Sequence, residues 1–160
     1  MKQHIQIKDI EGNYATIEKD RLIQTAVEQV RASFSSNPKL QSAASASDYL
    51  QALIGHLEHE VFYAIWLNSQ HQVIEHGQLF KGTIDNSSVY PREVVKDGLK
   101  ANAAAVIFAH NHPSGSSHPS QSDINITKRL KGALDLIDIR VLDHIVVGST
   151  VSSMAELGLL

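Results

Sequence analysis

The sequence predicts an α/β fold in which a mixed β-sheet is flanked by helices. Two β-prone apolar runs, 61–68 and 72–80, are separated by a short turn and predict an antiparallel hairpin. A nearly unbroken apolar run at 103–110 predicts a strand buried on both faces. Helical patterns lie between the later strands, so the order β-β-α-β-α-β describes a mixed sheet with helices packed against it.

The N-terminal region predicts a hairpin followed by a helix. Alternating apolar residues in 4–18 flank Gly12-Asn13, which can take the positive φ of a tight turn. Apolar residues recur at helical spacing from Asp20 to Phe34, with Asp20 available as N-cap. Residues 35–47 are small, polar and proline-containing, which predicts a linker.

We therefore expect an N-terminal arm at 1–45 and a main domain at 46–160. The first helix of the domain should begin near Asp48, with Ser47 or Asp48 as its cap. After a loop through Asp85 to Ser88, a second helix is expected from Pro91 to about Asn102, with the proline in its first turn. A third helix around 126–137, a strand at 140–148 and a terminal helix or tail complete the domain.

Composition limits the possible functions. The 160 residues suit one compact domain with a short arm, and the net charge of −3 argues against a surface built throughout for nucleic acid phosphates, although a local basic patch stays possible. The absence of cysteine excludes disulfides, thiolate zinc sites and cysteine nucleophiles, so a bound metal needs histidine and carboxylate ligands. No apolar run suits a signal peptide or a membrane span, which predicts a cytoplasmic protein without a membrane partner.

One segment combines potential metal ligands. His110 and His112 leave the end of the predicted buried strand two residues apart, so both imidazoles should project to the same side, with Asn111 opposite. A loop with proline and glycine follows, then Ser120 at the expected N-cap of a helix and Asp123 at its third position. Two imidazoles and a carboxylate make a three-ligand zinc site that keeps a fourth position for water.

Each half of this pattern has a simpler interpretation. Ser120-x-x-Asp123 is close to a capping box, which needs no metal, and His110 and His112 alone could be an incidental strand pair. Both occur, however, within fourteen residues at one strand–loop–helix corner. Capping and metal binding are also compatible, because Ser120 can cap the helix while Asp123 binds the ion.

The spacing H-x-H-x7-S-x-x-D resembles the motif of the JAMM/MPN⁺ (JAB) metalloproteases, whose members include deubiquitinating isopeptidases. The wider sequence over residues 46–160 is similar to the RadC family, and more closely to its short, mobile-element-associated (YeeS-like) members, since the helix-hairpin-helix region of longer members is not found. Four runs carry this likeness, in order: Leu79–Thr83, Pro91–Glu93, Ala103–Ser114 and Leu142–Ile145. The resemblance implies a cytidine-deaminase-like, JAB/MPN-type architecture with one zinc ion per chain.

The resemblance also implies roles for individual residues. Glu60 matches an upstream glutamate that takes a proton from the metal-bound water and later delivers it to the leaving amine. Glu58, two residues earlier, is the competing choice and fits the strand less well. Ser120 matches a serine that supports the oxyanion of the tetrahedral intermediate. Weaker candidates for a site role are Asn111, Arg92 and His144.

These features predict a zinc-dependent metallohydrolase, a peptidase or isopeptidase acting on a protein or peptide. The alternative is a DNA-associated accessory protein of RadC type, with a repair or mobile-element function, although Lys81, Arg92, Lys96 and Lys100 are too sparse to define a phosphate track. A metal-bearing scaffold without turnover is a third reading, against which the complete ligand set argues. The sequence does not identify the substrate, the substrate-binding residues or the oligomeric state.

Overall fold

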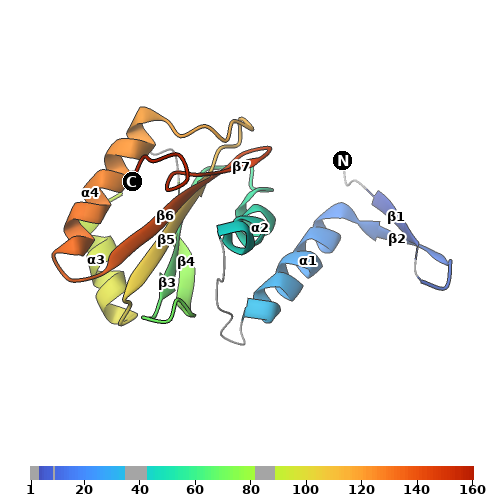
Figure 1. Cartoon of the computed structure of the whole chain (residues 1–160). Coiled ribbons are helices and arrows are strands. Elements are labelled where there is room, and N and C mark those ends of the chain that lie inside the picture. The colour runs from blue at the N-terminus through green and yellow to red at the C-terminus, as the bar shows by residue number, and fades with distance from the viewer. Residues whose placement is uncertain (1–3, 9, 35–42, 82–88) are drawn as a thin grey trace. The chain divides into compact units, whose positions relative to one another are not determined.

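A computed structural model describes residues 4–8, 10–34, 43–81 and 89–160 of the chain (Figure 1). The chain divides into two compact units, Met1–Ser36 and Asn37–Leu160, and each is described by itself. The predicted border between arm and domain, after residue 45, falls inside a helix, and a domain division at that position stays a prediction. Within the described ranges, no helix combines the length and the apolar character that crossing a membrane requires.

The first unit contains the predicted hairpin. Strand β1 (His4–Lys8) pairs antiparallel with β2 (Tyr14–Glu18), and Gly12 in the connection has a φ of 93°, where a glycine avoids the Cβ clash of other residues. Helix α1 (Lys19–Phe34) follows β2 directly. The predicted N-cap is wrong, because the helix begins at Lys19 and Asp20 lies inside its first turn.

The second unit is built on a five-stranded sheet in the order β4-β3-β5-β6-β7. Its strands are β3 (Val61–Leu67), β4 (Val73–Lys81), β5 (Ala105–Asn111), β6 (Arg140–Val147) and β7 (Val151–Ser153). β5 and β6 run parallel, whereas the other neighbouring pairs are antiparallel. These pairings confirm the predicted mixed sheet and the predicted hairpin of β3 and β4.

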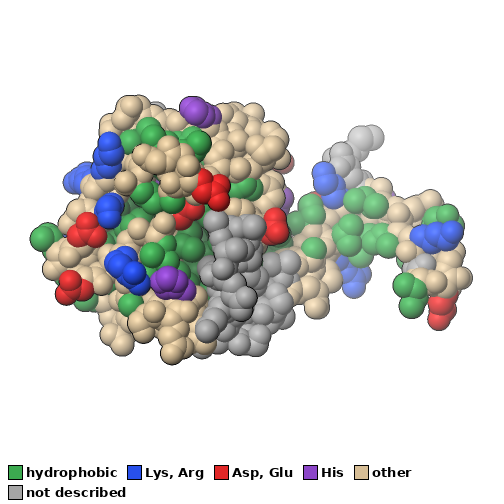
Figure 2. Space-filling model, viewed as in Figure 1, with side chains coloured by type: hydrophobic (Ala, Val, Ile, Leu, Met, Phe, Trp, Pro, Cys, Tyr) green, Lys and Arg blue, Asp and Glu red, His purple; other side chains and the backbone are tan. Residues whose placement is uncertain are grey.

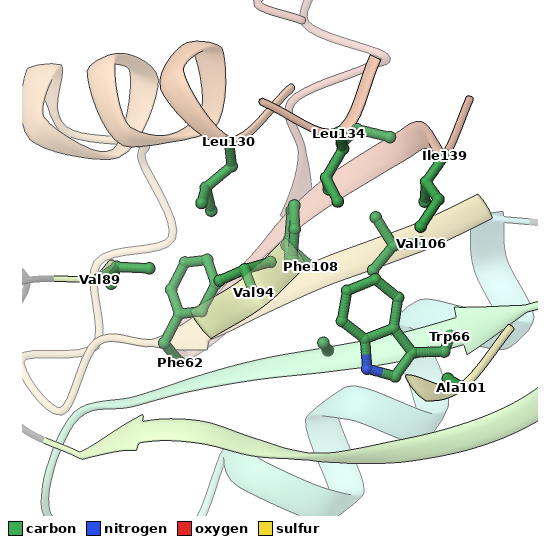
Figure 3. Packing of buried hydrophobic residues seen from close by; sticks show 12 residues of the cluster. Phe62, Trp66, Val89, Val94, Ala101, Val106, Phe108, Leu130, Leu134 and Ile139 are labelled. Atoms are coloured by element: carbon green, nitrogen blue, oxygen red, sulfur yellow. The ribbon is translucent and has the colours of Figure 1, made fainter. Parts of the chain in front are cut away.

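Helices cover both faces of this sheet. Helix α2 (Ala43–Ile54) packs on one face, and α3 (Pro91–Lys100) and α4 (Gln121–Asp135) cover the other (Figure 1). Figure 3 shows Leu130 and Leu134 of α4 facing Phe62 and Phe108 of the sheet, in a cluster of buried side chains. Every residue of β3 and β5 is buried, which confirms the strand predicted from the apolar run at 103–110.

Some predicted boundaries are wrong. Helix α2 begins at Ala43, within the segment predicted as a linker, so Ser47 and Asp48 lie inside the helix instead of capping it. Alanine is the strongest helix former, and three alanines at 43–46 outweigh the serines around them. The rest of that segment, 35–42, and the loop predicted at 85–88 lie outside the described residues.

The end of the chain also differs from the prediction. A short strand, β7, pairs antiparallel with the end of β6 and was not predicted, because three residues are too few to show an alternating pattern. Residues 154–158 form turns in place of the terminal helix that the sequence allowed. The helix predicted from Pro91 is confirmed, with Tyr90 as its N-cap and the proline in its first turn.

Candidate metal centre

The site lies where the end of β5 meets the beginning of β3. The two strands are antiparallel, and Phe62 pairs with His110. Glu60, just before β3, is therefore brought beside the residues that leave β5. His110 is fully buried, whereas the side chain of His112 keeps 17% of its surface exposed. The Nε2 atoms of these two histidines lie 2.9 Å apart, so the two imidazoles converge as the strand spacing predicted.

Asp123 reaches the same point from the first turn of α4. Ser120 is the N-cap of this helix, and its hydroxyl accepts a hydrogen bond from the Asp123 amide at 3.1 Å. The Ser120 amide donates in return to Asp123 Oδ2 at 2.6 Å, which completes the capping box. Asp123 Oδ1 lies 3.3 Å from His110 Nε2, and Oδ2 lies 3.6 Å from His112 Nε2. The carboxylate thus caps the helix and faces both imidazoles.

Backbone hydrogen bonds hold the loop between β5 and α4 in a tight reversal. The Gly115 amide donates to the carbonyl of His112 at 2.9 Å, and Gly115 has a φ of 87°, which favours glycine. The Ser149 amide donates to the Gly115 carbonyl at 2.8 Å. Space beside Gly148 is also limiting, since a Cβ there would lie 2.4 Å from that same carbonyl. This tight reversal brings Asp123 back toward the strand end.

The electrostatics of the centre keep the Asp123 carboxylate ionised. Burial acts to raise the pKa of Asp123, but the hydrogen bond and charge of His110, together with the bonds from Ser120, outweigh it. The pKa of Asp123 therefore lies well below its usual range. An ionised carboxylate that is only 1% exposed needs a positive partner beside it.

The nitrogens on the far side of both rings are engaged. His112 Nδ1 lies 2.9 Å from the carbonyl oxygen of Ser116, and His110 Nδ1 lies 2.8 Å from Nε2 of His144. Each ring therefore turns its Nε2 atom toward the Asp123 carboxylate. Two imidazole nitrogens and a carboxylate are a donor set that zinc prefers, and bonds that hold the opposite ring nitrogen accompany such ligands. The residues present fit a zinc ion.

A second carboxylate stands at this centre. One oxygen of Glu60 and one nitrogen each from His110 and His112 all lie within 4.8 Å of one another, so these three residues also form a possible metal-binding group. Glu60 is half-buried, whereas Glu58 is exposed and is not part of that group. The structure thus brings together the residues that the sequence singled out, and the division of the two carboxylates into ligand and base stays a prediction.

Two further residues of the site gain contacts that the sequence did not specify. Asn111 is buried, and its side chain accepts from the Val61 amide at 2.8 Å and donates to the carbonyls of Leu57 and His59 at 3.2 and 3.0 Å. It thereby holds the segment that carries Glu60. Thr127 lies one helical turn after Asp123, and its hydroxyl contacts His144. Helical spacing could have identified Thr127, because residues i and i+4 share a face.

Arg92, a weaker candidate, lies exposed in the first turn of α3. His144, the other histidine singled out, is buried and contacts His110. Burial and the nearby His110 lower the pKa of His144 well below its usual value, so its ring is neutral.

The mixed sheet, its covering helices and the clustered side chains at the end of β5 define a JAB/MPN-type domain. A model of the RadC-like JAB domain matches residues 40–159, and the chain belongs to the RadC family. A UPF0758 protein of Vibrio cholerae serotype O1 is 49% identical over 138 residues, which cover 86% of this chain and 87% of that protein.

A UPF0758 protein of Marinobacter nauticus is 56% identical over 122 residues, covering 76% of this chain and 54% of its own length. A second Vibrio cholerae relative of the same name is 48% identical over 141 residues, with 88% of this chain and 90% of that protein covered. The matched region therefore covers most of the two Vibrio cholerae relatives but only about half of the Marinobacter nauticus relative. The name UPF0758 states no activity.

Proposed function

We propose that the protein is a zinc-dependent hydrolase that cuts peptide or isopeptide bonds. The observation that carries the proposal is the convergence of His110 Nε2, His112 Nε2 and an ionised Asp123 carboxylate, with Glu60 beside them. We assign the first three residues as zinc ligands. A bound zinc ion would supply a Lewis acid that polarises the substrate carbonyl and makes water more acidic.

The surroundings of the two carboxylates support this assignment. Asp123 is buried and fixed by the Ser120 amide, as suits a permanent ligand. Glu60 is half-buried, so part of this residue is open to water. Glu60 would take a proton from the attacking water and deliver it to the leaving amine. The pair therefore divides the work of holding the ion and moving the proton.

Ser120 suits a role toward the substrate. Its hydroxyl oxygen accepts the bond of the helix cap, which leaves the hydroxyl proton to be donated elsewhere. Ser120 is exposed, and its amide donates to Asp123 Oδ2, the oxygen that lies 3.6 Å from Nε2 of the partly exposed His112. The hydroxyl would donate to the oxygen of the scissile carbonyl as negative charge develops on it. Substrate would approach on the side of Ser120 and His112, since these residues are exposed in whole or in part whereas His110 and Asp123 are buried.

The surface charges of the second unit do not favour nucleic acid binding. Figure 2 shows basic and acidic side chains mixed over the α3 and α4 side of the second unit, which gives the displayed part of that face no continuous basic track for phosphates. The residues that converge at the end of β5 are also metal ligands by type and not phosphate-binding cations.

Removal of metal tests the proposal. Zinc-loaded protein should cleave members of a panel of linear peptides and lysine-linked isopeptides, detected as product masses, and a chelator should abolish cleavage because the ligands alone cannot polarise the carbonyl. Added zinc should restore it. A panel cleaved equally well by the chelated protein, or not cleaved at all by the zinc-loaded one, would contradict the proposal.

Asn111 should affect turnover without affecting metal binding. Asn111→Ala removes three bonds that hold the backbone around Glu60. Since a displacement of about 1 Å can cost roughly 100-fold in rate, we expect a fall of about 10- to 100-fold in kcat. Zinc content should stay at one per chain, and unpaired buried backbone groups should lower the free energy of unfolding by about 1–3 kcal/mol.

The matched control for this prediction is Asn125→Ala, which removes an exposed amide from α4. Its turnover and its urea unfolding should equal those of the unchanged protein. Full turnover in Asn111→Ala, measured on folded protein, would show that the bonds to residues 57–61 do not position Glu60.

A further inference from the structure

His144 contacts both His110, near the end of β5, and Thr127, on the helix that carries Asp123. It lies on β6, parallel to β5, with its ring centroid 4.8 Å from that of His110. Its side chain is fully buried, and its ring meets Phe62 and Phe108 edge-on at 5.3 and 6.2 Å. Both ring nitrogens are nevertheless paired: Nε2 lies 2.8 Å from His110 Nδ1, and Nδ1 lies 2.5 Å from the hydroxyl oxygen of Thr127.

The direction of these hydrogen bonds follows from counting protons. The Thr127 hydroxyl donates its single proton to the carbonyl oxygen of Asp123 at 2.6 Å. A carbonyl oxygen has no proton to give, so this 2.6 Å contact takes the hydroxyl proton, and the Sδ atom of Met154 is a more distant neighbour at 3.8 Å. The hydroxyl oxygen is then left to accept from His144, so the proton of a neutral His144 ring is on Nδ1.

The same count then fixes His110. With its proton on Nδ1, His144 presents a lone pair at Nε2, and this atom must accept from His110. The Nδ1 atom of His110 therefore carries a proton, so the ring can offer the lone pair of its Nε2 atom, which lies 3.3 Å from the carboxylate of Asp123, to a metal ion. This is the form of the ring that can bind a metal.

We propose that His144 and Thr127 are positioning residues that fix His110 in its metal-binding tautomer and tie it to the helix that carries Asp123. The inference rests on the proposed zinc site and deepens it. Three contacts run in sequence from His110 to His144, from His144 to Thr127 and from Thr127 to the Asp123 carbonyl, and the Asp123 carboxylate faces His110 Nε2 at 3.3 Å, where a shared zinc ion would close the path. The buried ring of His144 thereby fixes the end of β5 relative to the first turn of α4.

Thr127→Val is the sharpest test, because valine keeps the shape of threonine and removes only the hydroxyl. Without that acceptor, the proton of His144 is no longer favoured on Nδ1, and a proton on its Nε2 would oppose the Nδ1 proton of His110. Loss of such a partner typically costs 10- to 100-fold in metal affinity, so we expect zinc to bind about 10- to 100-fold more weakly. The measurement is competition for zinc with a chromophoric chelator.

The matched control is Thr127→Ser, which restores the hydroxyl and should restore zinc affinity to within about threefold. A purely structural role would instead make Ser and Val alike in zinc affinity, or would lower only the melting temperature measured in chelator. Equal zinc affinity in the unchanged protein and in Thr127→Val would overturn the proposal.

A second pair of variants keeps the test valid if Thr127→Val does not fold. In His144→Gln the side-chain oxygen can replace Nε2 as acceptor for His110, whereas His144→Leu removes the acceptor. The glutamine variant should bind zinc more tightly than the leucine variant, and the reverse order would refute the positioning role of His144.

Nitrogen NMR of the histidine rings gives a readout that needs neither zinc nor turnover. His144 should carry its proton on Nδ1, and a proton on Nε2 would overturn the inference. Failure of the proposed function would look different. If the protein cleaves no peptide but its zinc affinity still responds to the Thr127 substitutions as described, the hydrolase proposal fails. The positioning role of His144 and Thr127 then stands.

Discussion

Asp123→Ala is expected to empty the metal centre. The substitution removes the carboxylate that faces both imidazoles at 3.3 and 3.6 Å, and a direct ligand matters more than an outer partner, whose loss costs about 10- to 100-fold. We therefore expect zinc affinity to fall by at least about 100-fold. Elemental analysis of the purified variant should find it nearly free of zinc, and full occupancy would refute the assignment of Asp123 as a ligand.

Asp123 also caps α4, so this variant needs two controls. Loss of the capping box should cost about 0.5–2 kcal/mol of stability whether or not metal is present. His112→Ala leaves the cap intact and should lose zinc as well, which separates ligation from capping. Asp135→Ala removes an exposed carboxylate from the other end of the same helix and should keep one zinc per chain.

The parts of the site that the sequence predicted depend on short-range rules. The apolar run before His110 fixed β5, and the two-residue spacing fixed the common direction of His110 and His112. Ser120 and Asp123 lie three residues apart, which is the spacing of a capping box, and the structure has that box. Each of these predictions needs only neighbours along the chain.

The parts that the sequence did not predict depend on strand register. His144 meets His110 only because β5 and β6 pair in parallel with Phe108 opposite His144, across 34 residues of chain. The bonds of Asn111 to residues 57–61 likewise require the antiparallel register of β3 and β5. Register is set by the packing of whole strands, which no local pattern encodes.

The predicted boundaries of some helices and strands were wrong for a related reason. Ala43 to Ser47 can be read as a linker or as a helix, and packing decides between them, since Ala46, Tyr49 and Leu50 are buried in the second unit. β7 owes its existence to the partner edge that β6 offers and not to its own three residues. Long-range packing therefore completed what propensity left open.

Glu60→Gln is expected to separate metal binding from catalysis. Glutamine has nearly the same shape as glutamate and cannot take up a proton at neutral pH. If Glu60 is the base, zinc should stay at one per chain while the rate of peptide cleavage falls by about 100- to 10,000-fold, the usual contribution of general base catalysis. The measurements are elemental analysis and initial rates on the same preparation.

Glu58→Gln is the matched control, since it makes the same change two residues earlier on an exposed side chain and should leave both quantities unaltered. Glu60 also forms a possible metal-binding group with His110 and His112. The zinc content of Glu60→Gln therefore also tests whether Glu60 is a metal ligand. Loss of zinc from Glu60→Gln, together with its retention in Asp123→Ala, would exchange the roles of the two carboxylates. Undiminished cleavage by Glu60→Gln would dismiss Glu60 as the base, because no proton acceptor would then remain at that position.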